Sequence, residues 1–378
     1  MASTDFNAGK FFRFLSVLTA ISLVILLAWY FASVTVYVII ALIITLLCVP
    51  LKELLVKIRF RKIRLGNTLS TILSLTVVAG SLLILFRLVF IPVTAEVNNL
   101  LSIDLSNMET TYDNVLEYTD KKLKDYKIIG EEEDLQQIVI QTTLDAVRKI
   151  NISSALGNIM HLLGSVFLGV FSVLFISFFF LKDFALLQKS GVNMMPEKHQ
   201  AEGMRIIQRS KKLLSNYFTG LFVEMLLMGL LEFLILFFLG IENALLISFI
   251  GGVLVVIPFL GSLIACFAGC IIAVVSGYMI SPDADIFIII LKVAGTFIVC
   301  RMLDNFFLQP FIASKSVKAH PLEIFLVVLL SGSLAGIPGM MLGIPAYTVL
   351  RIIAQEFFGY NNFVKTLTSR LGKENTDA

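Results

Sequence analysis

Long apolar segments alternate with short charged ones along most of the chain. The segments with apolar, helix-compatible patterns cover residues 11–30, 33–47, 69–91, 162–181, 217–239, 244–277, 281–308 and 321–347. An α-helix needs about 20 predominantly apolar residues to cross a hydrocarbon core that is about 30 Å thick. Most of these segments reach or approach that length. The pattern therefore predicts an all-α fold, that of a polytopic membrane protein.

The composition agrees with this prediction. Of 378 residues, 57% are hydrophobic and only 15% are charged, and the mean hydropathy is +0.90. An ordinary soluble enzyme is excluded, because soluble domains carry about 25% charged residues. The net charge of +3 is too small to indicate nucleic-acid binding. We expect membrane lipid as the surrounding partner and no nucleic acid.

The hydrophilic segments predict how the chain is divided and oriented. Residues 51–66, which follow an expected helix end at Pro50, and residues 182–215 are rich in Lys and Arg, as cytoplasmic loops are. The insert 93–155 has twelve acidic and six basic residues, and its apolar positions recur at helical spacing. We expect two amphipathic helices there, outside the membrane on the non-cytoplasmic side. The predicted divisions are 1–92 (membrane helices), 93–155 (insert), 156–354 (membrane region) and 355–378 (tail), with both termini cytoplasmic.

Two of the apolar segments contain helix breaks. Segment 244–277 is interrupted at Pro258 and Gly261, which leaves two pieces of about 15 residues. Segment 321–347 is interrupted at Gly336, Pro338 and Gly339. A broken helix within a membrane leaves backbone groups without partners unless they line a cavity or meet other protein. The two interrupted pairs are therefore candidate hinges beside a substrate site, as in many secondary transporters. The alternative is a pair of tight turns at the membrane surface.

A few charged or amide side chains fall within the apolar segments of the C-terminal half. The candidates for transport or ion coupling are Glu224, Glu232, Arg301, Asp304, Asn305 and Gln309. A charge at the centre of a membrane helix costs about 2.5–3.5 kcal/mol on insertion scales, so such residues need partners or water. Arg301 and Asp304 are three residues apart and can pair on one helix face. Proton or ion coupling is one interpretation of the set, and a structural ion-pair network between helices is the other.

Small residues recur at every fourth position in one segment. They are Gly261, Ala265, Gly269, Ala273 and Gly277. Such a stripe lets another backbone approach closely. We expect helix packing there, with a substrate route as the alternative.

The short motifs of several enzyme classes do not occur in the chain. It has no HExxH, GxSxG or GxxxxGK[ST] pattern, and its three histidines have no metal-ligand spacing. We expect no enzymatic activity, no cofactor and no metal site.

The C-terminal third contains a series of short motifs in a fixed order. They are VVIPFLG at 255–261, Asp304-Asn305, Gln309-Pro310, Lys315-Ser316, His320-Pro321, and then Gly332, Gly336, Gly339 and Pro345. In these motifs, and in its general layout, the chain resembles the autoinducer-2 exporter (AI-2E) family of permeases. One departure is Ser314, where that pattern commonly has glycine.

The resemblance implies a polytopic transporter of about eight transmembrane helices that works without ATP. It implies export of small molecules or exchange of sodium for protons, and it adds Pro345 to the candidate hinges. The resemblance also implies a homo-oligomer, for which the insert 93–155 is the natural contact surface. The alternative is that the apolar stripe of the insert packs within one protomer.

Three functions therefore stay open. The first is a secondary exporter of a small solute, such as a signalling molecule, in the cytoplasmic (inner) membrane of a prokaryote. The second is a sodium–proton antiporter that uses Glu224, Glu232 or Asp304. The third is an oligomeric membrane scaffold, in which the insert binds partners and the polar cluster is dry and fully paired.

Overall fold

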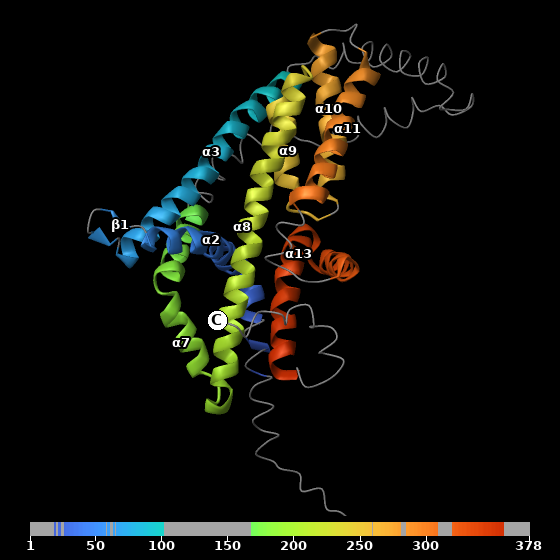
Figure 1. The fold of residues 1–378 in the computed structure, drawn as a ribbon. Coiled ribbons are helices and arrows are strands. Elements are labelled where there is room, and N and C mark those ends of the chain that lie inside the picture. The colour runs from blue at the N-terminus through green and yellow to red at the C-terminus, as the bar shows by residue number, and fades with distance from the viewer. Residues whose placement is uncertain are drawn as a thin grey trace, which may run out of the picture. The chain divides into compact units, whose positions relative to one another are not determined.

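The computed structural model describes residues 19, 22–23, 26–57, 59–60, 63–64, 66–101, 168–258, 260–280, 285–308 and 320–358 (Figure 1). The regular secondary structure of the described residues is helical except for a short antiparallel pair of two-residue strands, β1 (Arg59–Phe60) and β2 (Ile63–Arg64). It contains five helices long and apolar enough to cross a membrane, or six when one bent pair is counted as a span. The predicted all-α, polytopic membrane fold is confirmed. The amphipathic helices expected in the insert lie outside the described residues, except that α3 (Asn67–Leu101) continues into it.

The chain forms two units, the first made of residues 1–78 and 160–187. This unit contains α2 (Ala32–Lys57), the start of α3 and the helix Leu168–Lys182. Two side chains bind the carbonyl end of that last helix. Lys52 Nζ donates to the Leu181 carbonyl at 2.6 Å, and Asn67 Nδ2 donates to the Lys182 carbonyl at 3.1 Å.

Pro50 does not end its helix, contrary to the prediction. It lies inside α2, which continues to Lys57. Proline removes only one backbone donor, and in a membrane helix the neighbouring groups can satisfy the carbonyl that it frees. A proline is therefore a weaker stop signal here than in a soluble helix.

The second unit contains residues 79–159 and 188–378, and most of its described helices lie along α8 (Gln200–Phe238). The shorter α7 (Phe184–Asn193) and the 3-10 turn η1 (Glu197–His199) precede α8. Its 39 residues correspond to about 58 Å at 1.5 Å per residue, more than a hydrocarbon core is thick. In Figure 1, three helices lie beside the C-terminal part of α8, namely α9 (Ala244–Leu254), α10 (Gly261–Ile280) and α11 (Ile286–Leu303). Helix α13 (Pro321–Phe358) lies beside its N-terminal part.

The first helical hairpin consists of α9 (Ala244–Leu254) and α10 (Gly261–Ile280). Asn243 Nδ2, at the start of α9, lies 2.8 Å from Ser276 Oγ, near the end of α10. A Cβ on Gly261 would collide with the Leu254 carbonyl, so the other ends of the two helices also meet. The helices therefore run antiparallel, joined by loop 255–260. The predicted interruption is confirmed, although the two pieces are unequal, with 11 and 20 residues.

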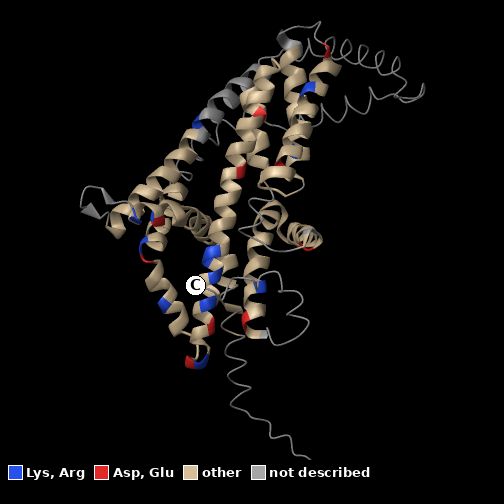
Figure 2. Cartoon of the chain, in the orientation of Figure 1, with Lys and Arg blue, Asp and Glu red and all other residues tan. Residues whose placement is uncertain are grey.

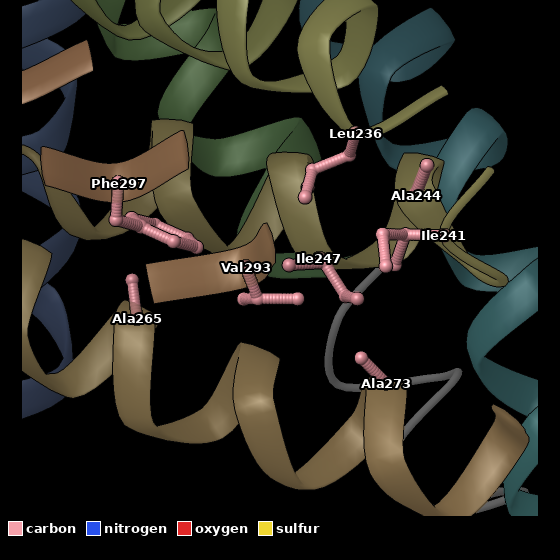
Figure 3. Close-up of a cluster of buried hydrophobic side chains, with 8 residues drawn as sticks. All are labelled: Leu236, Ile241, Ala244, Ile247, Ala265, Ala273, Val293 and Phe297. Carbon is pink, nitrogen blue, oxygen red and sulfur yellow. The ribbon is translucent and has the colours of Figure 1, made fainter. Parts of the chain in front are cut away.

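The small-residue stripe of α10 packs against neighbouring helices. Ala265 and Ala273 are buried with Ile247 of α9 and with Val293 and Phe297 of α11 (Ile286–Leu303) (Figure 3). Larger side chains at these positions would force α9 and α11 away from α10. The stripe therefore serves helix packing, as the sequence predicts.

The second helical hairpin is formed within α13 (Pro321–Phe358). Its helix is broken at Ala335 and Gly336, and Gly336 has φ +60° and ψ −143°, a conformation that favours glycine. Tyr347 donates to Glu323 Oε2 at 2.9 Å, and a Cβ on Gly343 would lie 3.5 Å from Val327. Residues after the break thus meet residues before it in reverse order. The arms 321–334 and 337–358 therefore fold back on each other.

Candidate intramembrane site at the first hairpin

The loop of the first hairpin reaches the middle of the apolar part of α8. A Cβ on Gly252 would lie 2.8 Å from the Met225 carbonyl and 3.0 Å from Gly229 Cα, so the end of α9 passes very close to these residues. Met225 is thirteen residues before the end of α8 at Phe238, a distance of about 20 Å along the axis. The end of α9 thus lies beside the middle of the apolar part of α8, and the chain turns back there into α10.

Three elements meet at this loop. Val255, the first residue of the loop, is buried with Met228 of α8 and Cys300 of α11. Leu308, at the end of the π-helical turn η2 (Asp304–Leu308), packs against the same cluster. The loop, the middle of α8 and the end of α11 therefore form one junction.

An ion pair lies one residue beyond Cys300. Arg301 Nη1 donates to Asp304 Oδ2 at 2.7 Å. The side chain of Asp304 is fully buried, whereas that of Arg301 is 30% exposed. Asp304 also begins η2, and π-helical turns within α-helices are frequent at functional sites. The predicted pairing on one helix face is found, and it lies at the junction.

Glu232 is buried between α8 and the first hairpin. It is 2% exposed, and within the described residues its Oε2 has no hydrogen-bond partner. A Cβ on Gly251 of α9 would collide with this oxygen and lie 3.0 Å from the Phe297 ring. The carboxyl group therefore occupies the space that a side chain at position 251 would need.

Glu224 lies on the same buried stretch of α8, two turns from Glu232. It is 4% exposed, and Met228 between them is 2% exposed. Eight residues correspond to about 12 Å along the helix, so the two carboxylates do not share one site. Tyr217 is close enough to Glu224 to interact with its charge.

The remaining predicted residues lie in different environments. Asn305 is exposed, Pro258 is half-buried and Gly261 is buried against Leu254. Gln309 lies outside the described residues. Of the hinge candidates in the second hairpin, Gly336 and Pro338 are exposed, whereas Gly339 and Pro345 are buried. The structure thus brings Glu232, Arg301 and Asp304 near the first hairpin, and Asn305 does not join them in the interior.

Comparison with known proteins shows the family. The profile described as AI-2E family transporter matches residues 18–359. This chain belongs to the AI-2E family. Two curated proteins of Bacillus subtilis (strain 168), named putative transport proteins YueF and YrrI, are 31% and 29% identical to it over 201 and 206 residues. These matches cover 53% and 54% of the chain. The chain spans about half the length of these curated relatives, 52% and 56%.

The AI-2E chain is accordingly a multi-pass membrane protein. Its family membership and its apolar helices agree on this point. A third relative, named putative transport protein MT0215, from Mycobacterium tuberculosis (strain CDC 1551 / Oshkosh), is 28% identical over 110 residues, 28% of the chain and 27% of its own length.

An apolar groove of about 350 Å³ lies on another side of the α8–α9 contact. Phe233 and Gly252, each next in sequence to a residue of the Glu232 site, line this groove. None of the six candidate charged or amide side chains is among its lining residues. Because Glu232 is only 2% exposed, its site is closed in this conformation, and a solute could reach it only if the packed helices moved.

The second hairpin is attached to α8 by ion pairs that the sequence does not reveal. Glu356 pairs with Arg205, and its Oε2 lies 3.5 Å from Arg209 Nη1. Figure 2 shows charged residues gathered at the N-terminal part of α8 and at the end of α13, with only isolated acidic positions farther along α8. The partners are about 150 residues apart in sequence, so no local spacing could have indicated them.

Two structural signals were also missed at the first hairpin. The pair Gly251-Gly252 allows α9 to approach α8, and a glycine pair within an apolar helix is visible in the sequence. Lys292 donates to the Leu239 carbonyl at 2.9 Å, at the C-terminal end of α8. A cation in this position stabilises a helix terminus, so Lys292 has a structural role there.

Proposed function

We propose that this AI-2E chain is a permease that exports a small solute, such as a signalling molecule, across the cytoplasmic membrane of a prokaryote by secondary transport. The observation that carries the proposal is the first hairpin, whose loop begins at Val255 against Cys300, the residue before the Arg301–Asp304 pair. In many secondary transporters, broken helices of this kind form the substrate site near the bilayer midplane. The family supports transport, and the export direction follows the family resemblance alone.

The first hairpin is the proposed moving element. Its contact with α8 includes a close backbone approach, in which Gly252 of α9 lies against Met225 and Gly229. Its site is closed in the conformation described above, so alternating access requires α9 and α10 to move against α8. Such a movement would expose Glu232 and the buried Asp304 to water or solute.

The scaffold hypothesis predicts a dry and fully paired polar cluster. Glu232 Oε2 is buried without a hydrogen bond within the described residues, and Arg301 is partly exposed. A purely structural network would gain nothing from an unpaired carboxyl oxygen, which is costly to bury. These two observations favour a transporter over a scaffold.

The proposal is tested by flux through the purified protein in proteoliposomes. Vesicles loaded with autoinducer-2 report export, and a pH-sensitive dye with added sodium reports antiport. We expect autoinducer-2 efflux that falls at least tenfold in Asp304→Asn, because the substitution removes the negative partner of Arg301. Glu242→Gln, at an exposed position between α8 and α9, is the matched control and should retain flux. Sodium-dependent proton movement without efflux would support the antiporter, and neither activity would support the scaffold.

A further inference from the structure

The surroundings of Glu232 determine which ion it can bind. Helix α9 contains no ionisable residue. The facing thiols, Cys266 of α10 and Cys300 of α11, are close enough to interact with the Glu232 charge. Cys270 lies one turn further along α10. Gly251 of α9 lies against the Glu232 carboxyl group, and the Phe297 ring lies next to Gly251.

The nearby charged groups are engaged elsewhere. On α11, Lys292 donates to the Leu239 carbonyl at the end of α8. Arg301 donates to Asp304. Glu224, the other carboxylate on this part of α8, is about 12 Å away along the helix axis. No described cation therefore neutralises Glu232 directly.

A hard metal cation finds too few ligands here. Such cations are held by several oxygen atoms, six to eight for Ca²⁺. The groups found near Glu232 include Gly251 and two thiols, Cys266 and Cys300, which are poor ligands for such a cation. Within the described residues, no group of three His, Cys, Asp or Glu side chains is arranged to hold a metal ion. A proton needs only one carboxyl oxygen, so the site fits a proton better than sodium.

We propose that Glu232 is a proton-binding site that is occupied while the first hairpin is seated on α8 and emptied when the hairpin moves away. This inference rests on the proposed movement of the hairpin and names its coupling ion. In the seated state the neutral acid avoids the cost of an unpaired charge in the membrane. When α9 leaves, water enters, the O–H bond of the acid breaks and the proton passes to water, which leaves a hydrated carboxylate.

Gly251 of α9 leaves room for the Glu232 carboxyl group between α8 and the first hairpin. Its missing side chain provides the space that the Glu232 carboxyl group occupies. The colliding atom is the far end of a flexible side chain, so Gly251→Ala can fold by displacing the carboxyl group. We expect this substitution to disturb the proton site without removing the acid. Gly295→Ala is the matched control, because nothing lies within 4 Å of a Cβ at that position.

Infrared difference spectroscopy of the full chain in lipid vesicles tests the inference without a transport assay. Exposed carboxylates are ionised at neutral pH, so the carbonyl band of a protonated carboxylic acid reports a buried acid. We expect such a band in the wild type, a weaker band in Glu232→Gln, and full retention in Glu242→Gln. In Gly251→Ala the band should shift, and in Gly295→Ala it should stay in place. Added sodium should leave the band unchanged.

Three results would overturn the inference. They are the absence of the band from the wild type, its persistence at full strength in Glu232→Gln, and its disappearance when sodium is added. If the Glu232→Gln variant does not fold, the Gly251→Ala variant provides the test. A band that does not shift in folded Gly251→Ala protein would also overturn the inference. A wild type without the band but with autoinducer-2 efflux would contradict the proton site alone. A band without any flux would contradict the transport proposal alone.

Discussion

Gly252 provides a direct test of the close contact between α8 and α9. In Gly252→Ala the new methyl group would lie 2.8 Å from the Met225 carbonyl oxygen and 3.0 Å from Gly229 Cα. Ordinary contacts between carbon atoms are about 3.5–4.0 Å. The atoms in question belong to backbone within a helix, which cannot rotate aside as a side chain can. The end of α9 must therefore move away from α8 by several tenths of an ångström.

The cost follows from overpacking. Inserting a methyl group into a close-packed interface typically costs about 1–3 kcal/mol. Alanine also gains about 0.5–1 kcal/mol over glycine within a helix, and this gain partly offsets the loss. Gly295→Ala makes the same helical gain in α11 with nothing within 4 Å of the new Cβ. The difference between the two variants isolates the contact, and we expect it to be about 1–3 kcal/mol.

The free energy of unfolding can be compared in mixed detergent micelles with increasing denaturing detergent, followed by circular dichroism. Gly252→Ala should unfold at a lower fraction of denaturing detergent than the wild type, and Gly295→Ala at the same or a higher fraction. Equal midpoints for the two variants would refute the close α8–α9 approach. The position of the hairpin loop at the middle of α8 would then have no support.

Two further predictions concern the second hairpin. Gly336→Ala should lower the free energy of unfolding by about 1–3 kcal/mol, because φ +60° strains any other residue; stability equal to that of Gly295→Ala in the same micelles would contradict this. Glu356→Gln should lower the free energy of unfolding by about 0.2–1 kcal/mol at low salt, because it removes the negative partner of Arg205 and Arg209. The effect should be smaller at high salt, because dissolved ions screen these charges. A thermal melting shift that does not depend on salt would refute the role of these ion pairs.

Much of the fold could be predicted because the membrane imposes a simple rule on the sequence. Apolar length predicted the spans, and the end of α8 near Leu239 agreed with the predicted segment 217–239. The breaks near Pro258 and at Gly336 were predicted because proline and glycine interrupt helices by local chemistry. Pro50 shows the limit of that chemistry, since the surrounding helix continues through it.

The candidate site could be predicted only in part. The pairing of Arg301 with Asp304 follows from their spacing of three residues, a local property of any helix. Glu232 could be recognised as an anomalous charge in an apolar segment, but its neighbours could not. Gly251 comes next to it only because α9 folds back along α8.

The sequence by itself therefore determined that the chain lies in a membrane and where its helices break. It also determined which charged side chains are costly to bury there without a partner or water. Only the tertiary structure decided that the broken segments fold into hairpins, that one loop lies near the middle of α8, and that no cation among the described residues pairs with Glu232. The physical reason is that hydropathy and backbone chemistry act over a few neighbouring residues. The environment of a buried charge is instead set by residues from helices that meet only after folding.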